Sequence, residues 1–348
     1  MRAARVVFGA GKLDTLRDEA AHLGAKRALV LSTPEQADLA QKAAAILGDR
    51  AVGAFDKVAM HVPINIAIEG REVANRLNAD CLVAMGGGST TGLAKAIALE
   101  TGLPILAIPT TYAGSEMTAV YGITDGGVKT TGTDWRVLSK TVIYDPGLTL
   151  TLPVALSVVS GLNAIAHSAE GLYAQNGNPV ISLMAEEGIR AMVAGLRKLV
   201  ESPMDRPARC DCLYGAWLCG MVLGSVGMAL HHKLCHTLGG SFDLPHAQTH
   251  AVVLPHAIAY NAVAAPDAAA RICRALGTEN GNAGGALFDL AQSLGAPVSL
   301  KQIGMREAEL DRATDIALQK PYWNPRVIDR AAIHALLGAA FDGSRPDE

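Results

Sequence analysis

Short hydrophobic runs recur through the first half of the chain, and each run is continuous rather than alternating with polar residues. They cover residues 28–32, 81–85, 105–108 and 142–144. A strand that is hydrophobic at every position is typical of a sheet covered by helices on both faces. These runs therefore predict four buried strands.

Between the runs, hydrophobic residues recur at the spacing of a helix. Residues 63–78 and 93–100 both place apolar side chains about 3.6 positions apart. The alternation of strand and helix predicts an α/β N-terminal domain with a parallel sheet. Sheets of this kind bind ligands at the carboxyl ends of their strands.

The pattern changes near residue 153, where strand signals stop and helical signals take over. The connector 145–153 carries two prolines and a glycine, which mark a domain boundary. We expect residues 1–152 to form a dinucleotide-binding domain and residues 153–348 an all-α substrate and catalytic domain. The apolar stretch 216–230 is shorter than the roughly 20 residues that span a bilayer, so we expect a helix buried inside the second domain.

Composition narrows the possible partners. The net charge of -3 comes without a run of like charges, so nothing favours nucleic acid or a membrane surface, and a small-molecule partner remains. The first residues lack an export signal, which predicts a cytoplasmic location in which the six cysteines stay reduced. The apolar helical half favours a homodimer.

A glycine run follows the second predicted strand. Gly86, Gly87, Gly88 and Ser89 stand directly before a predicted helix. Glycines let the backbone approach a pyrophosphate, and a helix N-terminus supplies unpaired N–H groups. The run predicts a seat for a nucleotide diphosphate, although it also fits a tight turn without any ligand.

Two other strand ends carry hydroxyl groups. Thr110, Thr111 and Ser115 follow the strand at 105–108, where a cofactor would lie, but they also suit a capped turn. Thr33 follows the first strand, and no Asp or Glu lies in Ser32-Thr33-Pro34. A carboxylate there would repel a 2′-phosphate, so its absence indicates that NADH and NADPH both fit.

Histidines gather in the second half. Asn163 and His167 stand four apart, as do His232 and His236, and this spacing puts each pair on one face of a helix. His246 follows a Gly-Gly pair, which we expect to form a turn, and a proline. A single histidine is usually a packing residue, whereas this repeated geometry predicts a shared active site.

The order of these motifs resembles the iron-containing alcohol dehydrogenase family. The motifs follow one another through nearly the whole chain. They are GGGS before a helix, PTT-x-x-GSE, N-x-x-x-H, H-x-x-x-H-x-LGG, a later PH and a final NPR. The resemblance implies the fold that this family shares with dehydroquinate synthase and glycerol dehydrogenase.

The resemblance also raises the question of a metal. Metal-using members hold a divalent ion with an Asp and three His, and the matching positions here are Asn163, His167, His232 and His246. The Asp is missing, and a neutral amide is a poorer ligand for a dication. Gly92 also stands where the family usually has Asp. We therefore expect no metal.

These departures are shared by one branch of the family, the maleylacetate reductases, which the strings GGGSTTGLAKAIAL, HHKLCH and FDLPHA-x-TH resemble closely. The resemblance implies reduction of the carbon–carbon double bond of maleylacetate to 3-oxoadipate by NADH or NADPH, in the degradation of aromatic compounds.

Roles for single residues follow from this hypothesis. His167, His232 and His246 would anchor the substrate and polarise its enolate, with His236 as a proton donor. Lys233 and Arg326 are candidates for binding the substrate carboxylates, with Asn163 and Tyr322 beside them; an ordinary surface or core position is an equally good interpretation of Lys233, Tyr322 and Arg326.

Three other functions stay open. A metal-dependent alcohol or glycerol dehydrogenase would tolerate Asn163 as a ligand. A lyase similar to dehydroquinate synthase would use NAD only transiently. A non-catalytic nucleotide-binding regulator is disfavoured by the convergent histidines.

Overall fold

A computed structural model describes residues 4–126, 128–278 and 281–347. The chain divides into two compact units, Met1–Leu152 and Pro153–Glu348, so the division falls within the connector 145–153. No helix in the described ranges is long and apolar enough to cross a membrane.

The first unit is built on a six-stranded parallel sheet. The strand order is β1-β8-β5-β4-β2-β3. The strands are β1 (Arg5–Phe8), β2 (Ala28–Leu31), β3 (Ala51–Phe55), β4 (Cys81–Gly86), β5 (Ile105–Pro109) and β8 (Thr141–Tyr144).

The four predicted strands are confirmed as β2, β4, β5 and β8, and all four are buried along their length. The strands that we did not predict, β1 and β3, lie at the two edges of the sheet and are only partly buried. An edge strand does not need a continuous hydrophobic run, so the pattern that reveals a central strand is weak there. An antiparallel hairpin of β6 (Val120–Asp125) and β7 (Val128–Thr133) was also not predicted.

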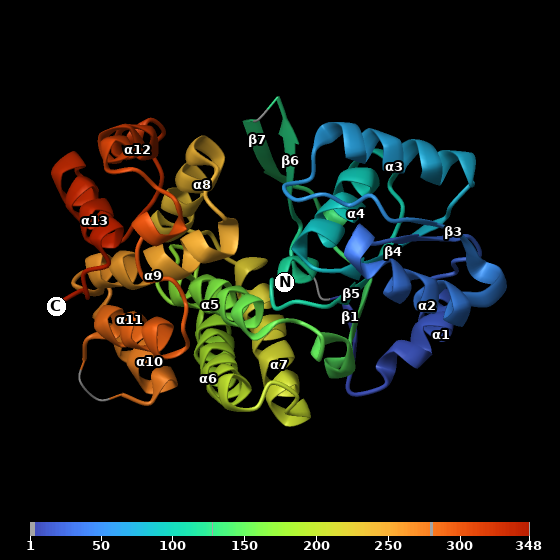
Figure 1. Ribbon diagram of the computed structural model, residues 1–348, viewed down its shortest axis with the longest axis horizontal. Helices are drawn as coiled ribbons and strands as arrows, with labels where there is room; N and C mark the ends of the chain where they lie inside the picture. The colour runs from blue at the N-terminus through green and yellow to red at the C-terminus, as the bar shows by residue number, and fades with distance from the viewer. Residues whose placement is uncertain (1–3, 127, 279–280, 348) are drawn as a thin grey trace. The chain divides into compact units, whose positions relative to one another are not determined.

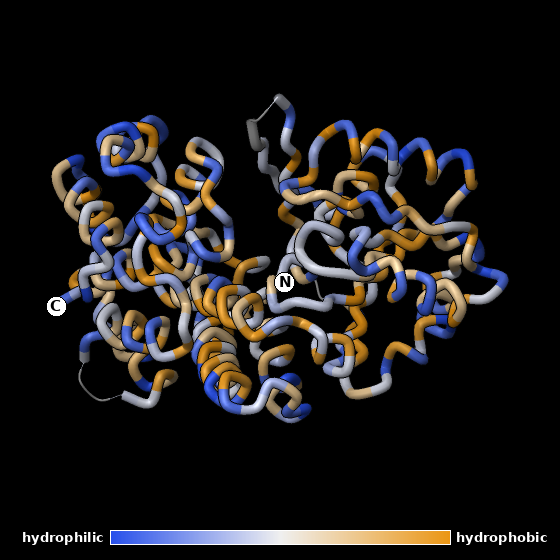
Figure 2. The backbone as a smooth tube through the Cα atoms, viewed as in Figure 1, coloured by the Kyte–Doolittle hydropathy of each residue, from blue (hydrophilic) through white to orange (hydrophobic). Residues whose placement is uncertain are grey.

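Four helices cover this sheet. They are α1 (Leu16–His22), α2 (Ala37–Leu47), α3 (Ile64–Arg76) and α4 (Gly88–Thr101). Figure 1 shows α1 and α2 on one face and α3 and α4 on the other. Val30, Val83 and Ile108 pack with α1 and α2, while the alternate residues of the same strands point to the opposite face. Figure 2 shows the contrast between the hydrophobic residues of β4 and β5 and the mixture of hydrophobic and hydrophilic residues along α3.

Every regular element in the described part of the second unit is a helix. The longer helices are α5 (Val154–Gly171), α6 (Pro179–Glu201), α7 (Arg206–Leu223), α8 (Leu230–Phe242), α9 (His246–Ala262), α10 (Pro266–Leu276), α11 (Ala283–Ser293), α12 (Leu310–Leu318) and α13 (Arg330–Asp342). The expectation of an all-α second half is confirmed.

Two local expectations were wrong. Residues 216–230 do not form one helix, because α7 ends at Leu223 and α8 begins only at Leu230. Gly224 and Gly227 lie in the break, and glycine weakens a helix by about 1 kcal/mol relative to alanine. Gly239 and Gly240 do not form a turn either, since both lie inside the last turns of α8.

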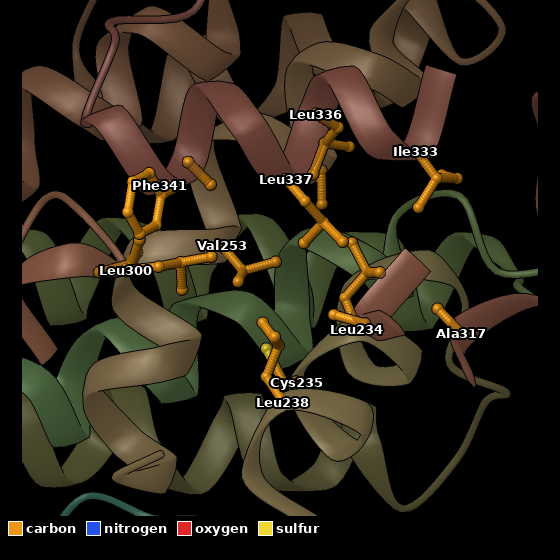
Figure 3. Packing of buried hydrophobic residues seen from close by; sticks show 14 of the residues in the cluster. Leu234, Cys235, Leu238, Val253, Leu300, Ala317, Ile333, Leu336, Leu337 and Phe341 are labelled. Atoms are coloured by element: carbon orange, nitrogen blue, oxygen red, sulfur yellow. The ribbon is translucent and has the colours of Figure 1, made fainter. Parts of the chain in front are cut away.

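One core cluster of this unit joins four helices (Figure 3). Leu234, Cys235 and Leu238 of α8 meet Val253 of α9, with side chains of α12 and α13 packed around them. Cys235 is fully buried there, and all six cysteines are free thiols. Five of the six are buried, so most of the cysteines act as small core residues.

Helices α6 and α7 pack more closely than ordinary side chains allow. A Cβ on residue 215 would lie 2.8 Å from the backbone nitrogen of Met192, and one on residue 195 would lie 2.8 Å from the carbonyl oxygen of Ala208. Backbone atoms cannot move aside as a flexible side chain can, so these glycines are required for the helix contact.

We predict opposite effects for two Gly-to-Ala substitutions in helices. Gly215→Ala should lower the free energy of unfolding by about 1–3 kcal/mol, because its methyl group overlaps the α6 backbone. Gly338→Ala in α13 meets nothing within 4 Å, so it should raise that free energy by up to about 1 kcal/mol. Denaturant unfolding followed by circular dichroism measures both, and equal effects would contradict the close packing of α6 and α7.

Candidate active site

The predicted cofactor residues stand at three neighbouring strand ends in the first unit. β4 pairs with β2 on one side and with β5 on the other, and Gly86 is in register with Pro109. The backbone N–H of Thr110 donates to the carbonyl oxygen of Gly86 over 3.1 Å. Gly87 is the N-cap of α4, and Gly88 and Ser89 form its first turn.

Two of the three glycines, Gly86 and Gly87, are required by neighbouring side chains. A Cβ on residue 86 would lie 2.3 Å from Oγ1 of Thr90, and one on residue 87 would lie 2.9 Å from Cγ2 of Thr111. A Cβ on residue 88 would make only an ordinary 3.5 Å contact with Ala113. The first backbone N–H groups of α4 therefore lie next to residues without side chains, so a phosphate group could approach them closely.

Gln36 links the strand ends and was not predicted. Its Nε2 donates to Oγ1 of Thr110 over 2.8 Å, so the segment after β2 contacts the segment after β5. Thr33 is extended and precedes a short 3₁₀ helix, Pro34–Gln36. Because Thr33 and Gln36 belong to the same turn, this hydrogen bond also holds Thr33 beside the glycine run.

Lys95 anchors the segment that contains Ser115. Its fully buried Nζ donates to the carbonyl oxygens of Ser115 and Val120, each over 2.7 Å, and to Oγ1 of Thr118 over 2.9 Å. Burial lowers the pKa of Lys95 to about 7, while the negative charge of Glu116 opposes this shift. Lys95 therefore connects α4 to the loop after β5, a role that its place in GLAK did not reveal.

In the second unit, three helices bring imidazole rings together. His167 lies on α5, His231 and His232 on α8, and His250 on α9. Nδ1 of His167 is 2.9 Å from Nε2 of His232, and Nε2 of His231 is 2.9 Å from Nδ1 of His250. All four rings are buried.

The other predicted histidines surround this group. The ring of His236 lies 6.2 Å from that of His232, centroid to centroid, and its residue is exposed. The ring of His246 lies 4.4 Å from that of His250. The structure thus brings His167 and His232 into direct contact and places His236 and His246 at the edge of the cluster.

Sequence reasoning missed His231 and His250, which are the most deeply buried rings. A signal was present, because His246 and His250 repeat the four-residue spacing that identified the other pairs. Burial lowers the pKa of His231 to about 3 and holds that of His250 well below its usual range, with nearby imidazoles adding to both shifts. Both rings are therefore neutral at physiological pH.

A buried carboxylate, Glu170, lies behind the cluster and was also missed. Its Oε2 is 2.6 Å from Nδ1 of His232, and its two oxygens accept the backbone N–H groups of Ala229 and His231 at 3.0 and 2.8 Å. Burial alone would raise the pKa of Glu170, but the hydrogen bond and positive charge of His232 lower it to about 2. Glu170 is thus ionised in the interior of the unit.

The predicted substrate-binding residues are less closely grouped. Nζ of Lys233 stands 5.7 Å from the ring centroid of Tyr322. The guanidinium of Arg326 lies 4.2 Å from the ring centroid of Tyr260 and donates to that residue's carbonyl oxygen. Arg326 is exposed, so it packs on α9 while remaining accessible to a ligand.

Two polar oxygens near the predicted site lack hydrogen bonds. Among the residues that the structure describes, none donates to Oδ1 of Asn163 or pairs with the hydroxyl of Tyr322, although both atoms are buried. Burial raises the pKa of Tyr322, and the charge of Glu170 adds to this shift. The Tyr322 hydroxyl is therefore a neutral donor at physiological pH.

Two sets of residues offer metal-binding atoms. The first is the set implied by the resemblance, namely an amide oxygen of Asn163 and the imidazoles of His167, His232 and His246. The second is His231, Cys235 and His250, whose ligand atoms lie within 4.8 Å of one another. In the second set the two imidazoles are hydrogen-bonded to each other, and all three residues are shut off from solvent.

Comparison with known proteins places both units in one family. Residues 3–146 match the model for iron-containing alcohol dehydrogenase, and residues 157–341 match the C-terminal model of the same family. The maleylacetate reductase of Burkholderia cepacia is 62% identical over 345 residues, which cover 99% of this chain and 97% of that protein. The maleylacetate reductase of Sphingobium indicum is 56% identical over 98% of this chain and 96% of that protein.

A solved structure agrees with these sequence matches. The crystal structure of maleylacetate reductase from Agrobacterium tumefaciens superimposes with a TM-score of 0.96 at 53% identity, covering 99% of this chain and 98% of that one. The chain therefore belongs to the iron-containing alcohol dehydrogenase family.

Proposed function

We propose that this protein is a maleylacetate reductase, which reduces the carbon–carbon double bond of maleylacetate to give 3-oxoadipate. The observation that carries the proposal is the similarity, along nearly the whole chain, to proteins of that name. The residues of the helical unit are chemically suited to this reaction.

A nicotinamide dinucleotide supplies the hydride, as the membership of this oxidoreductase family implies. The backbone of Gly86, Gly87 and Gly88 and the hydroxyl of Ser89 would bind its pyrophosphate at the start of α4. Thr110, Thr111 and Ser115 would line the same site from the next strand end. Thr33 would lie near the adenine ribose, where no carboxylate in Ser32-Thr33-Pro34 excludes a 2′-phosphate, so we infer that NADPH also binds.

The reaction requires stabilisation of an enolate. Hydride forms a bond to the alkene carbon that is β to the ketone, and the electron pair of the double bond moves towards the ketone oxygen. A proton then adds to the α carbon, and a bound dihydronicotinamide would be oxidised as the source of the hydride. Hydrogen-bond donors aimed at the ketone oxygen lower the barrier, because negative charge develops there in the transition state.

The imidazoles are the donors that we assign to this task. His167 and His232 are in contact with each other, and His246 would complete the group from the start of α9. The exposed His236 would donate the proton to the α carbon, since a ring in contact with solvent can be reprotonated after each turnover. Lys233 and Arg326 would bind the two carboxylates, with Asn163 and Tyr322 as neutral partners.

We infer that the reaction proceeds without a metal. Asn163, His167, His232 and His246 bring no negative charge, whereas a dication is held best when a carboxylate is among its ligands. The buried carboxylate nearest to them, Glu170, has both oxygens occupied by backbone N–H groups and by His232. This set fits a divalent ion poorly.

We predict that the protein acts on maleylacetate in preference to a simple aldehyde. Purified protein should oxidise NADH or NADPH in proportion to the maleylacetate supplied and should act much more slowly on a simple aldehyde. The fall in nicotinamide absorbance measures both rates. Preference for the aldehyde would favour a metal-dependent alcohol dehydrogenase, and turnover without net loss of NADH would favour a lyase.

We predict that turnover does not depend on a divalent metal. Protein purified without chelator should contain well under one equivalent of any divalent metal by mass spectrometry, and its rate with maleylacetate should be unchanged after dialysis against a strong chelator. Stoichiometric metal whose removal abolishes turnover would overturn the proposal of a metal-free site.

We predict that a side chain at position 88 weakens binding of the cofactor. Gly88→Ala should raise the KM for NADH about tenfold or more, because a methyl group on the first residue of α4 obstructs close approach by the cofactor. Its midpoint of unfolding should stay near that of the wild type, since the methyl group makes only an ordinary contact with Ala113. Gly338→Ala is the matched control and should leave this KM unchanged.

A further inference from the structure

The side chain of Gln36 crosses the carboxyl end of β4. In the sheet, β2 and β5 lie on either side of β4. Gln36 follows β2, and its Nε2 reaches Oγ1 of Thr110, which follows β5, over 2.8 Å. A Cβ on residue 86 would lie 2.9 Å from Oε1 of Gln36, so the amide lies directly beside Gly86. The side chain therefore spans the place where the glycine run begins.

Both ends of this bridge are held by the backbone. The N–H of Gln36 donates to the carbonyl oxygen of Thr33 over 3.0 Å, within the 3₁₀ turn that follows β2. The N–H of Thr110 donates to the carbonyl oxygen of Gly86 over 3.1 Å. Because neither residue stands on a free loop, the contact between their side chains has a defined geometry.

The direction of the hydrogen bond between the side chains follows from its donor. An amide N–H group can only donate, so Oγ1 of Thr110 is the acceptor. The hydroxyl proton of Thr110 must then point away from Gln36. In the part of the chain that the structure describes, that proton has no acceptor.

A pyrophosphate is the acceptor that suits this place. Gly87, Gly88 and Ser89 form the N-cap and first turn of α4, directly after the end of β4. The N–H groups there and the hydroxyl of Thr110 are all donors, whereas the oxygens of a pyrophosphate are all acceptors. If Gln36 accepted instead of donating, Thr110 would use its single proton on Gln36 and present only lone pairs to the phosphate.

We propose that Gln36 is a positioning residue for the cofactor, which donates to Thr110 and thereby directs the hydroxyl proton of Thr110 to the pyrophosphate of the nicotinamide dinucleotide. Gln36 acts on the cofactor through Thr110. The inference rests on the proposed function for the cofactor and its site, but it does not depend on the identity of the substrate.

Two variants of Gln36 test the proposal, with the Kd for NADH measured by fluorescence titration in the absence of substrate. Gln36→Met keeps the length of the side chain but cannot donate, so Kd should rise about three- to tenfold. Gln36→Glu keeps the shape but can only accept from Thr110, and it adds a negative charge, so Kd should rise about tenfold or more. Gln41→Met is the matched control, because Gln41 is exposed on α2, and its Kd should stay within about twofold of the wild type.

The variant Thr110→Val separates the direction of the hydrogen bond from the added charge. It removes the hydroxyl at nearly constant volume, so the Kd for NADH should rise about tenfold or more. In the Thr110→Val background, the further effect of Gln36→Glu reports the charge alone and should be several-fold smaller than in the wild-type background. Equal effects in both backgrounds would overturn the proposal.

A purely structural role for Gln36 predicts another result. Glutamate can still accept from Thr110, so a brace between the strand ends would survive in Gln36→Glu. Its Kd for NADH would then stay within about twofold of the wild type, whereas the midpoint of unfolding of Gln36→Met would fall. That outcome would also overturn the proposal. Circular dichroism measures the midpoint, and Kd is expressed per folded molecule.

A third measurement needs no variant of Gln36. ADP carries a diphosphate but no nicotinamide, and Thr110→Val should weaken its binding by about the same factor as the binding of NADH. Equal Kd values of Thr110→Val and wild type for ADP would overturn the proposal even if the variants of Gln36 fail to fold. Wild-type protein that binds NADH but does not reduce maleylacetate would refute only the proposed substrate, whereas wild-type protein that does not bind NADH would refute this inference as well.

Discussion

Burial of the Glu170 carboxylate is the constraint around which the site in the helical unit is arranged. An ionised group removed from water is destabilising unless donors surround it, and its donors here come from residues 229–232. Because these residues include the start of α8, the carboxylate determines where α8 begins relative to α5. The directions of His231 and His232 follow from that contact.

The first unit uses a buried amino group in a similar way. Lys95 on α4 binds carbonyl and hydroxyl oxygens of residues 115–120, and it thereby holds the loop after β5 beside the glycine run. In each unit, one buried ionisable side chain thus holds the candidate site residues in place through hydrogen bonds to backbone groups. Replacing either group with an apolar side chain would leave several backbone groups without partners, which is costly in a dry environment.

The sequence predicted the parts of the fold that depend on local pattern. Continuous hydrophobic runs identified the central strands β2, β4, β5 and β8, and four-residue spacing identified His167 and His232 as members of one site. The edge strands β1 and β3 were not predicted, because a partly exposed strand lacks a continuous hydrophobic run. The break between α7 and α8 was not predicted, because Gly and Ser within an apolar stretch are compatible with either a helix or a turn.

Other parts of the site could not be predicted because they depend on which helix faces meet. Glu170 continues the face of Asn163 and His167, but a carboxylate on an apolar helix can form a cap, an ion pair or a ligand. Only the position of α8 shows that Glu170 caps this helix and also accepts a hydrogen bond from His232. Gln36 and Lys95 are similar cases, since the partner of Gln36 lies 74 residues away along the chain and the partners of Lys95 lie 20 to 25 residues away.

The two departures from the family pattern, Gly92 and Asn163, have separate physical causes. A Cβ on residue 92 would lie 2.7 Å from Cγ2 of Val62. Val62 and the preceding His61 have positive φ, and Thr124 holds this turn through hydrogen bonds to both carbonyl oxygens. Gly92 is therefore explained by packing in the first unit, without reference to a metal.

Asn163 is explained by charge instead. It lies on α5, whose only acidic residue is Glu170, seven positions away and about 10 Å along the helix axis. A carboxylate at position 163 would add a second buried negative charge to the cluster, which a metal ion would have to neutralise. With an amide there, α5 brings one buried negative charge to the cluster rather than two, and the N–H groups at the start of α8 stabilise that charge on Glu170.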